Sequence, residues 1–104
     1  MATAAQLAYP HIVKTPGVRA GKACIDGTRI AVVDVVAAHR SGLSPEEICN
    51  HFSSRPLTLA EIHSALAYYY DHREEIEDYF EESRKAAEEL QRDPDAYIRS
   101  LGRK

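Results

Sequence analysis

Residues 21–30, GKACIDGTRI, run directly into AVVDVVAAHR, and these two blocks decide the expected fold. The run ACI at residues 23–25 is β-prone, and Asp26-Gly27 is a dipeptide favoured in two-residue hairpin turns. Glycine suits such a turn because a positive φ is costly for a residue with a Cβ atom. We therefore predict a β-hairpin whose second strand covers residues 28–32.

A further β-prone run, HIV at residues 11–13, precedes this hairpin and ends at the turn signal Thr15-Pro16-Gly17. Three short strands bury little apolar surface by themselves. We therefore expect the small N-terminal β-ribbon to pack on helices or on a second copy of itself.

At residue 32 the period of the apolar residues changes from 2 residues, typical of a strand, to 3.6 residues, typical of a helix. The predicted helix ends at Ser41-Gly42. Two capping boxes follow, SPEE at residues 44–47 and TLAE at residues 58–61. In each, Ser or Thr caps a helix and a Glu three residues later reciprocates. They predict a short helix over residues 45–52 and a longer one over residues 59–71.

The helix over residues 59–71 has an apolar stripe at spacings of three and four. The residues predicted to face inward are Leu59, Ile62, Leu66, Tyr69 and Tyr70. The residues predicted to face outward are Ala60, Glu61, Ser64, Tyr68 and Asp71.

A long charged helix is predicted over residues 73–92. Its few apolar residues recur four and three apart, which makes a narrow seam suited to a partner helix and hence a candidate dimer seam. The seam residues are Ile76, Phe80, Ala87 and Leu90. A last short helix, with Tyr97, Ile98 and Leu101 inward, is expected after Asp93-Pro94.

These elements define a mainly α protein: a three-helix, helix-turn-helix core with the β-ribbon at residues 1–72, and a charged helical extension at residues 73–104. A chain of 104 residues is the size of one domain. The net charge of −3 is unevenly spread, because residues 1–44 hold five bases and two acids, whereas residues 73–104 hold seven bases and ten acids. No leader or membrane span is evident in the sequence, so we expect a cytoplasmic protein.

The sequence predicts no catalytic, cofactor or metal site, and therefore not an enzyme. Residues 17–23, GVRAGKA, have three residues between the glycines where a Walker loop has four, and a strand follows them. Cys24 has no evident base beside it. Asp26 is explained by the turn, and Asp34 by the favourable position of an acid in the first turn of a helix. The five histidines match no zinc spacing.

Whether the chain can bind DNA depends on which lysine and arginine residues its helices expose. The helix over residues 59–71 contains no Lys or Arg, which makes it a poor reader of a phosphate-lined groove. The basic residues instead gather in the ribbon and at the ends of the helices; the candidate DNA contacts are Lys14, Arg19, Lys22, Arg29, Arg40 and Arg55. Ordinary helix packing and solvated bases explain the same pattern and stay open as alternatives.

The blocks GKACIDGTRIAVVDVVAAHRSGLSPEEICNHF and LTLAEIHSALAYYYDHREEIEDYF resemble the bacterial domain-of-unknown-function family numbered 433 over roughly residues 11–80. The family pattern has proline at the positions of Ala23 and Ala31. Members resemble antitoxins encoded beside a PIN-type ribonuclease toxin and have a homeodomain-like helix-turn-helix. The resemblance therefore implies a small dimeric DNA-binding antitoxin or regulator, and it assigns no catalytic or ligand residues.

The acidic extension has its own physical interpretation. An acidic helix competes with RNA phosphates for a basic cleft, so it suits a ribonuclease partner. The candidate partner-binding residues are Glu74, Glu77, Asp78 and Glu81. Two function classes remain: an antitoxin-like regulator that binds a toxin and operator DNA as a homodimer, and a non-enzymatic adaptor with a helix-turn-helix shape and no DNA role.

Overall fold

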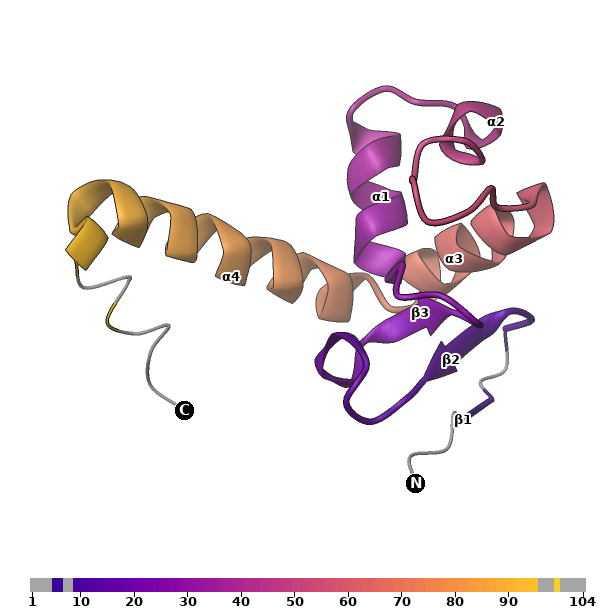
Figure 1. Cartoon of the computed structure of the whole chain (residues 1–104), viewed down its shortest axis with the longest axis horizontal. Coiled ribbons are helices and arrows are strands. Elements are labelled where there is room, and N and C mark those ends of the chain that lie inside the picture. Colours follow the sequence, from indigo (N-terminus) through magenta and orange to yellow (C-terminus); the bar gives the residue numbers. More distant parts are fainter. Residues whose placement is uncertain (1–4, 7–8, 96–98, 100–104) are drawn as a thin grey trace. The chain divides into compact units, whose positions relative to one another are not determined.

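The computed structural model describes residues 5–6, 9–95 and 99 of the 104-residue chain. The chain divides into two compact units, Met1–Arg73 and Glu74–Lys104, which we describe separately. The expected mainly helical architecture, with a small N-terminal sheet and a long C-terminal helix, is confirmed (Figure 1).

A three-stranded antiparallel sheet opens the chain, in the order β1 (Ala5–Gln6), β2 (Ile12–Lys14) and β3 (Ala23–Ile25). The two longer strands are those predicted from the sequence. In their register Ile12 lies opposite Ile25 and Val13 lies opposite Cys24. Ile12 and Ile25 are completely buried, because helices α1 (Val32–Arg40) and α3 (Leu59–Asp71) pack against this sheet.

The predicted strand over residues 28–32 is wrong. The turn after β3 is closed by the Thr28 amide, which donates to the Ile25 carbonyl at 3.0 Å, and φ is positive at Gly27 but not at Asp26. A hairpin on a two-residue loop favours turns of types I′ and II′, whereas a positive φ at the third turn position alone is the type II pattern, which splays the strands. Only one bridge therefore forms, between Cys24 and Ala31.

Helix α1 (Val32–Arg40) ends as predicted at a glycine. Gly42 has φ +108°, its amide donates to the His39 carbonyl at 3.1 Å, and the Leu43 amide donates to the Ala38 carbonyl at 3.4 Å. This pair of hydrogen bonds is the Schellman motif, which satisfies carbonyl groups that the helix end leaves unpaired.

Both capping boxes are confirmed. At α2 (Pro45–Ile48) the Ser44 amide donates to Glu47 at 2.9 Å, and at α3 (Leu59–Asp71) the Thr58 amide donates to Glu61 at 2.9 Å. The predicted length of α2 is wrong, however, since the helix ends at Ile48 rather than at residue 52. The chain turns away because the Cys49 carbonyl accepts from the buried Leu57 at 2.8 Å instead of continuing the helix.

The three helices α1, α2 and α3 pack on one another and form the core of the first unit (Figure 1). The predicted inward face of α3 is correct at Ile62, Leu66 and Tyr69 and wrong at its two ends. Leu59 is 43% exposed and Tyr70 is 54% exposed. Three α3 residues that the spacing did not assign to the inward face are buried instead: Glu61, Ala65 and Tyr68. Glu61 is buried because it pairs with Arg55, and Tyr68 is buried because its ring stacks on His72.

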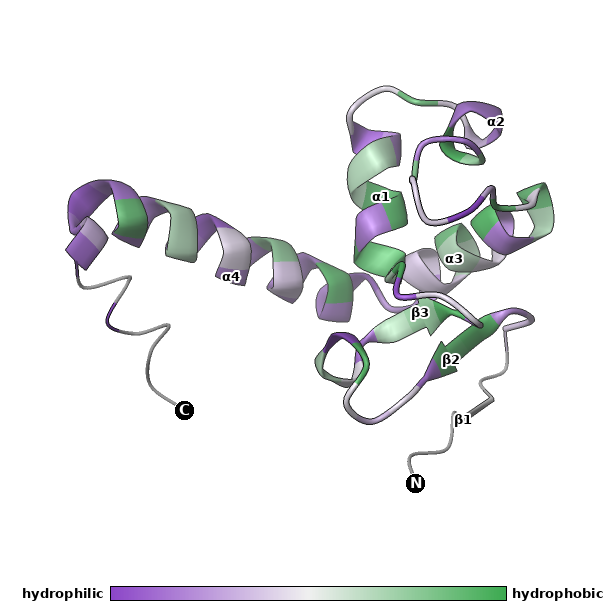
Figure 2. Cartoon of the chain, in the orientation of Figure 1, coloured by the Kyte–Doolittle hydropathy of each residue, from purple (hydrophilic) through white to green (hydrophobic). Residues whose placement is uncertain are grey.

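Helix α4 (Arg73–Arg92) has the predicted bounds and is more hydrophilic than α1 and α3 (Figure 2). Arg84 forms ion pairs along the helix with Glu81 at 2.5 Å and with Glu88. Ile76 is buried, whereas Ala87 and Leu90 are exposed. The predicted last helix with Tyr97, Ile98 and Leu101 lies outside the described residues. Among those described, no helix is both long and apolar enough to cross a membrane.

Candidate functional site

A groove of about 490 Å³ lies beside the turn that follows β3. Its lining residues are Val13, Thr15, Val18, Cys24, Asp26, Gly27, Thr28, Arg29 and Ser54. Val13 and Cys24 form a cross-strand pair and alternate with Ile12 and Ile25, so they face the opposite side of the sheet. The groove therefore has an apolar floor on the sheet and polar walls on the turn.

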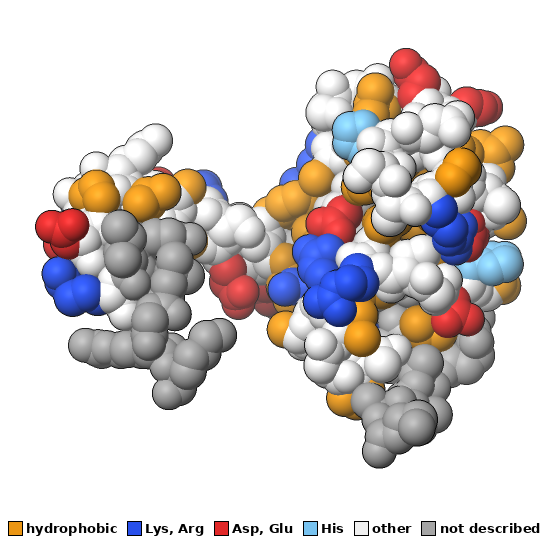
Figure 3. Space-filling model, in the orientation of Figure 1, with side chains coloured by type: hydrophobic (Ala, Val, Ile, Leu, Met, Phe, Trp, Pro, Cys, Tyr) orange, Lys and Arg blue, Asp and Glu red, His pale blue; other side chains and the backbone are white. Residues whose placement is uncertain are grey.

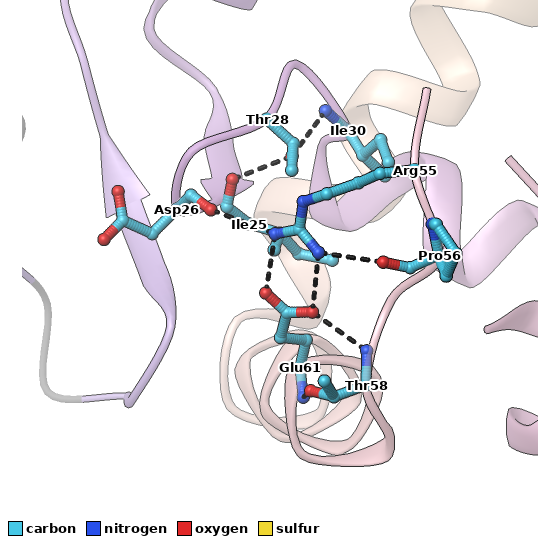
Figure 4. Close-up of polar contacts among 8 residues, drawn as sticks. All are labelled: Ile25, Asp26, Thr28, Ile30, Arg55, Pro56, Thr58 and Glu61. Atoms are coloured by element: carbon cyan, nitrogen blue, oxygen red, sulfur yellow. Dashed lines mark hydrogen bonds and ion pairs between the residues drawn. The ribbon is translucent and has the colours of Figure 1, made fainter. Parts of the chain in front are cut away.

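Thr28 fixes the shape of this turn (Figure 4). Its hydroxyl donates to the Ile25 carbonyl at 2.8 Å and accepts from the Ile30 amide at 3.0 Å. One side chain thus bridges both ends of the turn, which keeps the backbone on the groove wall in a single conformation.

Arg55 ties the turn to the start of α3 (Figure 4). Its guanidinium holds both carboxylate oxygens of Glu61, at 2.8 and 3.2 Å, and donates to the Pro56 carbonyl at 2.9 Å. It also reaches the Asp26 carbonyl at 3.5 Å. The bond from Arg55 is the main reason that the pKa of Glu61 falls to about 2, and the capping bonds to Thr58 lower it further against the opposing effect of burial.

Arg19 holds the other end of the turn. Its guanidinium contacts Asp34 at 2.5 and 3.3 Å and donates to the Arg29 carbonyl at 2.9 Å. Asp34 also accepts from the Ala31 amide at 2.9 Å, so it caps α1 as its position predicted. The hydrogen bond to Asp34 raises the pKa of Arg19. The sequence did not reveal this ion pair, because its members lie fifteen residues apart with no motif to join them.

The structure brings three of the six predicted DNA-contacting bases together. Arg19 donates to the Arg29 carbonyl at 2.9 Å, and the Lys22 amide donates to the Arg19 carbonyl at 3.2 Å, so the three residues adjoin one another. Burial raises the pKa of the Cys24 thiol on the groove floor; the charges of Arg19, Arg29 and Lys22 oppose that rise, and the charge of Asp34 adds to it. Figure 3 shows one cluster of basic side chains on this face of the core unit and further basic side chains apart from it.

Of the remaining three basic residues, Arg55 also contacts the groove turn, whereas Lys14 and Arg40 contact aromatic side chains of α3. The Lys14 ammonium sits 6.0 Å from the centre of the Tyr68 ring, Arg40 donates to the Tyr69 hydroxyl at 2.9 Å, and Arg55 is paired with Glu61 as described above. The six bases are therefore not one continuous surface. In the part of the chain that the structure describes, no group of three His, Cys, Asp or Glu side chains is arranged to hold a metal ion.

An aromatic cluster that the sequence did not predict joins the N-terminal segment to the end of α3. Tyr68 stacks on His72 with ring centres 4.1 Å apart and meets Tyr9 edge-on at 5.3 Å. The Tyr9 hydroxyl donates to the Asp71 carboxylate, and this bond raises the pKa of Tyr9 to about 12. The pairing spans sixty-two residues, which explains why no local pattern predicts it.

On α4, the predicted partner-binding residues Glu74, Glu77, Asp78 and Glu81 are all exposed. Along the helix they lie three, one and three residues apart, so these carboxylates extend from its first turn into its third. The exposed side chains at the start of α4 are therefore mainly acidic, whereas basic residues lie beside the groove.

The family model for DUF433, a protein family of unknown function, matches residues 12–69, which is more than half of the chain. The chain belongs to the DUF433 family. The match covers β2, the groove turn and all three core helices up to Tyr69, and it ends before α4.

A solved structure supports this assignment. The crystal structure of a DUF433 member protein from Anabaena variabilis is similar to this chain with a TM-score of 0.60 and 33% sequence identity, and the match covers 66% of each chain. No curated protein matches the chain significantly.

Proposed function

We propose that this DUF433 chain is a non-enzymatic, cytoplasmic, antitoxin-like regulator. In this proposal it forms a homodimer, binds a PIN-type ribonuclease toxin through α4, and contacts operator DNA through the bases of its core. The observation that carries the proposal is the separation of charge: Lys22 and Arg29 adjoin the carboxylate-paired Arg19 on the core unit, whereas exposed carboxylates follow one another along α4.

The toxin contact is supported by the exposure of α4. Carboxylates on a solvent-facing helix are complementary to the basic cleft in which a ribonuclease holds RNA phosphates. The apolar residues beside them, Ala87 and Leu90, are exposed as well and supply the seam for a second α4 in the proposed homodimer.

Copurification with a co-expressed PIN-type ribonuclease tests this contact. Neutralising Glu74, Glu77, Asp78 and Glu81 with Gln or Asn should weaken binding at least tenfold. A matched variant with Glu82→Gln, Glu88→Gln and Glu89→Gln removes charge further along the same helix and should leave binding nearly unchanged. Equal loss in both variants, or none in either, would contradict a local carboxylate contact.

The DNA contact is supported by Arg29, which lies on an exposed turn beside two other bases. Each phosphate contact adds roughly 0.9 to the slope of log affinity against log salt. Fluorescence anisotropy on the promoter of the gene should therefore show a slope that falls by about this amount per chain in Arg29→Ala, while Lys85→Ala on α4 changes nothing.

The adaptor function without DNA is the second candidate, and a specific observation favours it. Arg19 and Arg55 are paired with carboxylates, and α3 carries neither Lys nor Arg. Absence of any DNA shift at low salt, together with retained partner binding, would select the adaptor.

A further inference from the structure

We propose that the groove beside Arg29 binds a small amphiphilic monocarboxylate, with its carboxylate on the Arg29 guanidinium and its hydrocarbon part on the apolar floor. This ligand site uses neither α4 nor a toxin, but it shares Arg29 with the proposed DNA contact, so the ligand and DNA would compete for this guanidinium.

The size and lining of the groove fit a small molecule. Its volume of about 490 Å³ falls within the range of roughly 300–1,000 Å³ that is usual for ligand pockets. Val13 and Cys24 on the floor are almost fully buried, and Val18 closes one side. Removing a short hydrocarbon chain from water against this floor is favourable in proportion to the apolar area covered.

The charges select the ligand's polar end. Within the described residues, the Arg29 side chain makes no hydrogen bond or ion pair, although its own carbonyl is held by Arg19. Its guanidinium therefore presents donors that suit a carboxylate geometrically. The charge of Lys22 adds to the positive potential at the same floor, whereas the charge of Arg19 is offset by its ion pair with Asp34.

Asp26 limits how much negative charge the groove accepts. This residue lines the groove together with Arg29, and its carboxylate points away from the Arg55 guanidinium (Figure 4). A ligand with a second carboxylate placed next to Asp26 would be repelled by this charge. The groove therefore favours one carboxylate joined to an apolar body over a dicarboxylate.

The walls are already in place before a ligand arrives. Thr28 bridges the turn, Arg55 joins it to Glu61, and Arg19 joins it to Asp34. A rigid site loses less conformational entropy on binding, which raises the affinity that a small ligand can reach.

Titration with octanoate tests the proposal in the intact chain. Methyl-resolved NMR should show octanoate shifting the signals of Val13 and Val18, while acetate, octanol and the dicarboxylate suberate bind at least tenfold more weakly. Arg29→Met keeps the length of the side chain but removes its charge, so it should weaken octanoate binding roughly tenfold or more. Arg92→Met at the end of α4 is the matched control and should bind octanoate as the native chain does.

A second variant guards against an indirect effect of Arg29. Val18→Ser shortens the apolar wall and should weaken octanoate binding while circular dichroism shows the same helix content. The proposal is overturned if octanoate leaves the Val13 and Val18 methyl signals unmoved at millimolar concentration. It is equally overturned if octanol binds as tightly as octanoate, or if Arg29→Met and Arg92→Met bind alike.

Discussion

The ion pair between Arg55 and Glu61 predicts a defined loss of stability in acid. The pKa of Glu61 is about 2 in the folded chain, against an ordinary value of 4.5. Because the folded pKa is the lower one, the stabilisation is fully present above about pH 4.5 and is lost as the pH falls towards 2. At about 1.4 kcal/mol per pKa unit the shift corresponds to roughly 3 kcal/mol, and solvent screening at the 39% exposed Arg55 reduces this to about 2 kcal/mol.

Glu61→Gln isolates the ion pair, since glutamine still completes a capping box. Urea unfolding at pH 7 should show this variant about 2 kcal/mol less stable than the native chain, and the difference should shrink steadily between pH 5 and pH 2. The matched control is Glu47→Gln, which changes the same position of the other capping box, where Glu47 is held by Ser44 with no arginine partner in the described structure. Its effect should be much smaller at every pH.

A difference between Glu61→Gln and the native chain that stays constant from pH 7 to pH 2 would refute the electrostatic origin. So would an equal effect of Glu47→Gln, because capping alone would then account for both.

Three other perturbations test separate parts of the fold. Gly27→Ala should lower the free energy of unfolding by about 1–2 kcal/mol in urea titrations, because φ is +78° although nothing lies within 4 Å of the added Cβ; Gly27→Asn, which tolerates this conformation, should cost less. Tyr9→Phe should remove a tyrosine that ionises near pH 12 from a spectrophotometric titration, and a native titration in which no tyrosine ionises near pH 12 would contradict the bond to Asp71. Leu90→Glu should dissociate the proposed homodimer in light scattering, whereas Lys85→Glu should not, and equal masses for the two variants would exclude the seam.

Local chemistry made much of this fold predictable from the sequence. The starts of α2 and α3 followed from Ser and Thr placed three residues before Glu, and the end of α1 followed from Gly42, because caps are satisfied by residues within one turn of each other. The predictions failed where a residue distant in sequence forms a contact that overrides the local pattern. Helix α2 is short because Leu57 takes the carbonyl of Cys49, and Tyr68 is buried because Tyr9 lies against it.

The groove could not be predicted from the sequence either, because residues distant in sequence form it. The sequence marked Gly27 and Arg29 as notable, but it could not show that Ser54 from the loop after α2 completes the wall. The pairings that fix this wall join residues six to fifteen positions apart across different elements, and side chains at such separations are brought together only by the tertiary packing.

The paired arginines also change what the basic residues can do. The sequence offers six lysine and arginine residues as candidate phosphate contacts. A guanidinium bound to a carboxylate, however, has its charge largely neutralised, so it releases few counterions from DNA. Arg19 and Arg55 are of this kind, whereas Lys14 and Arg40 lie near the rings of Tyr68 and Tyr69. At most four bases per chain therefore remain, and their contribution to the salt slope is bounded at about 3.6 per chain. A steeper slope would require bases from outside this set.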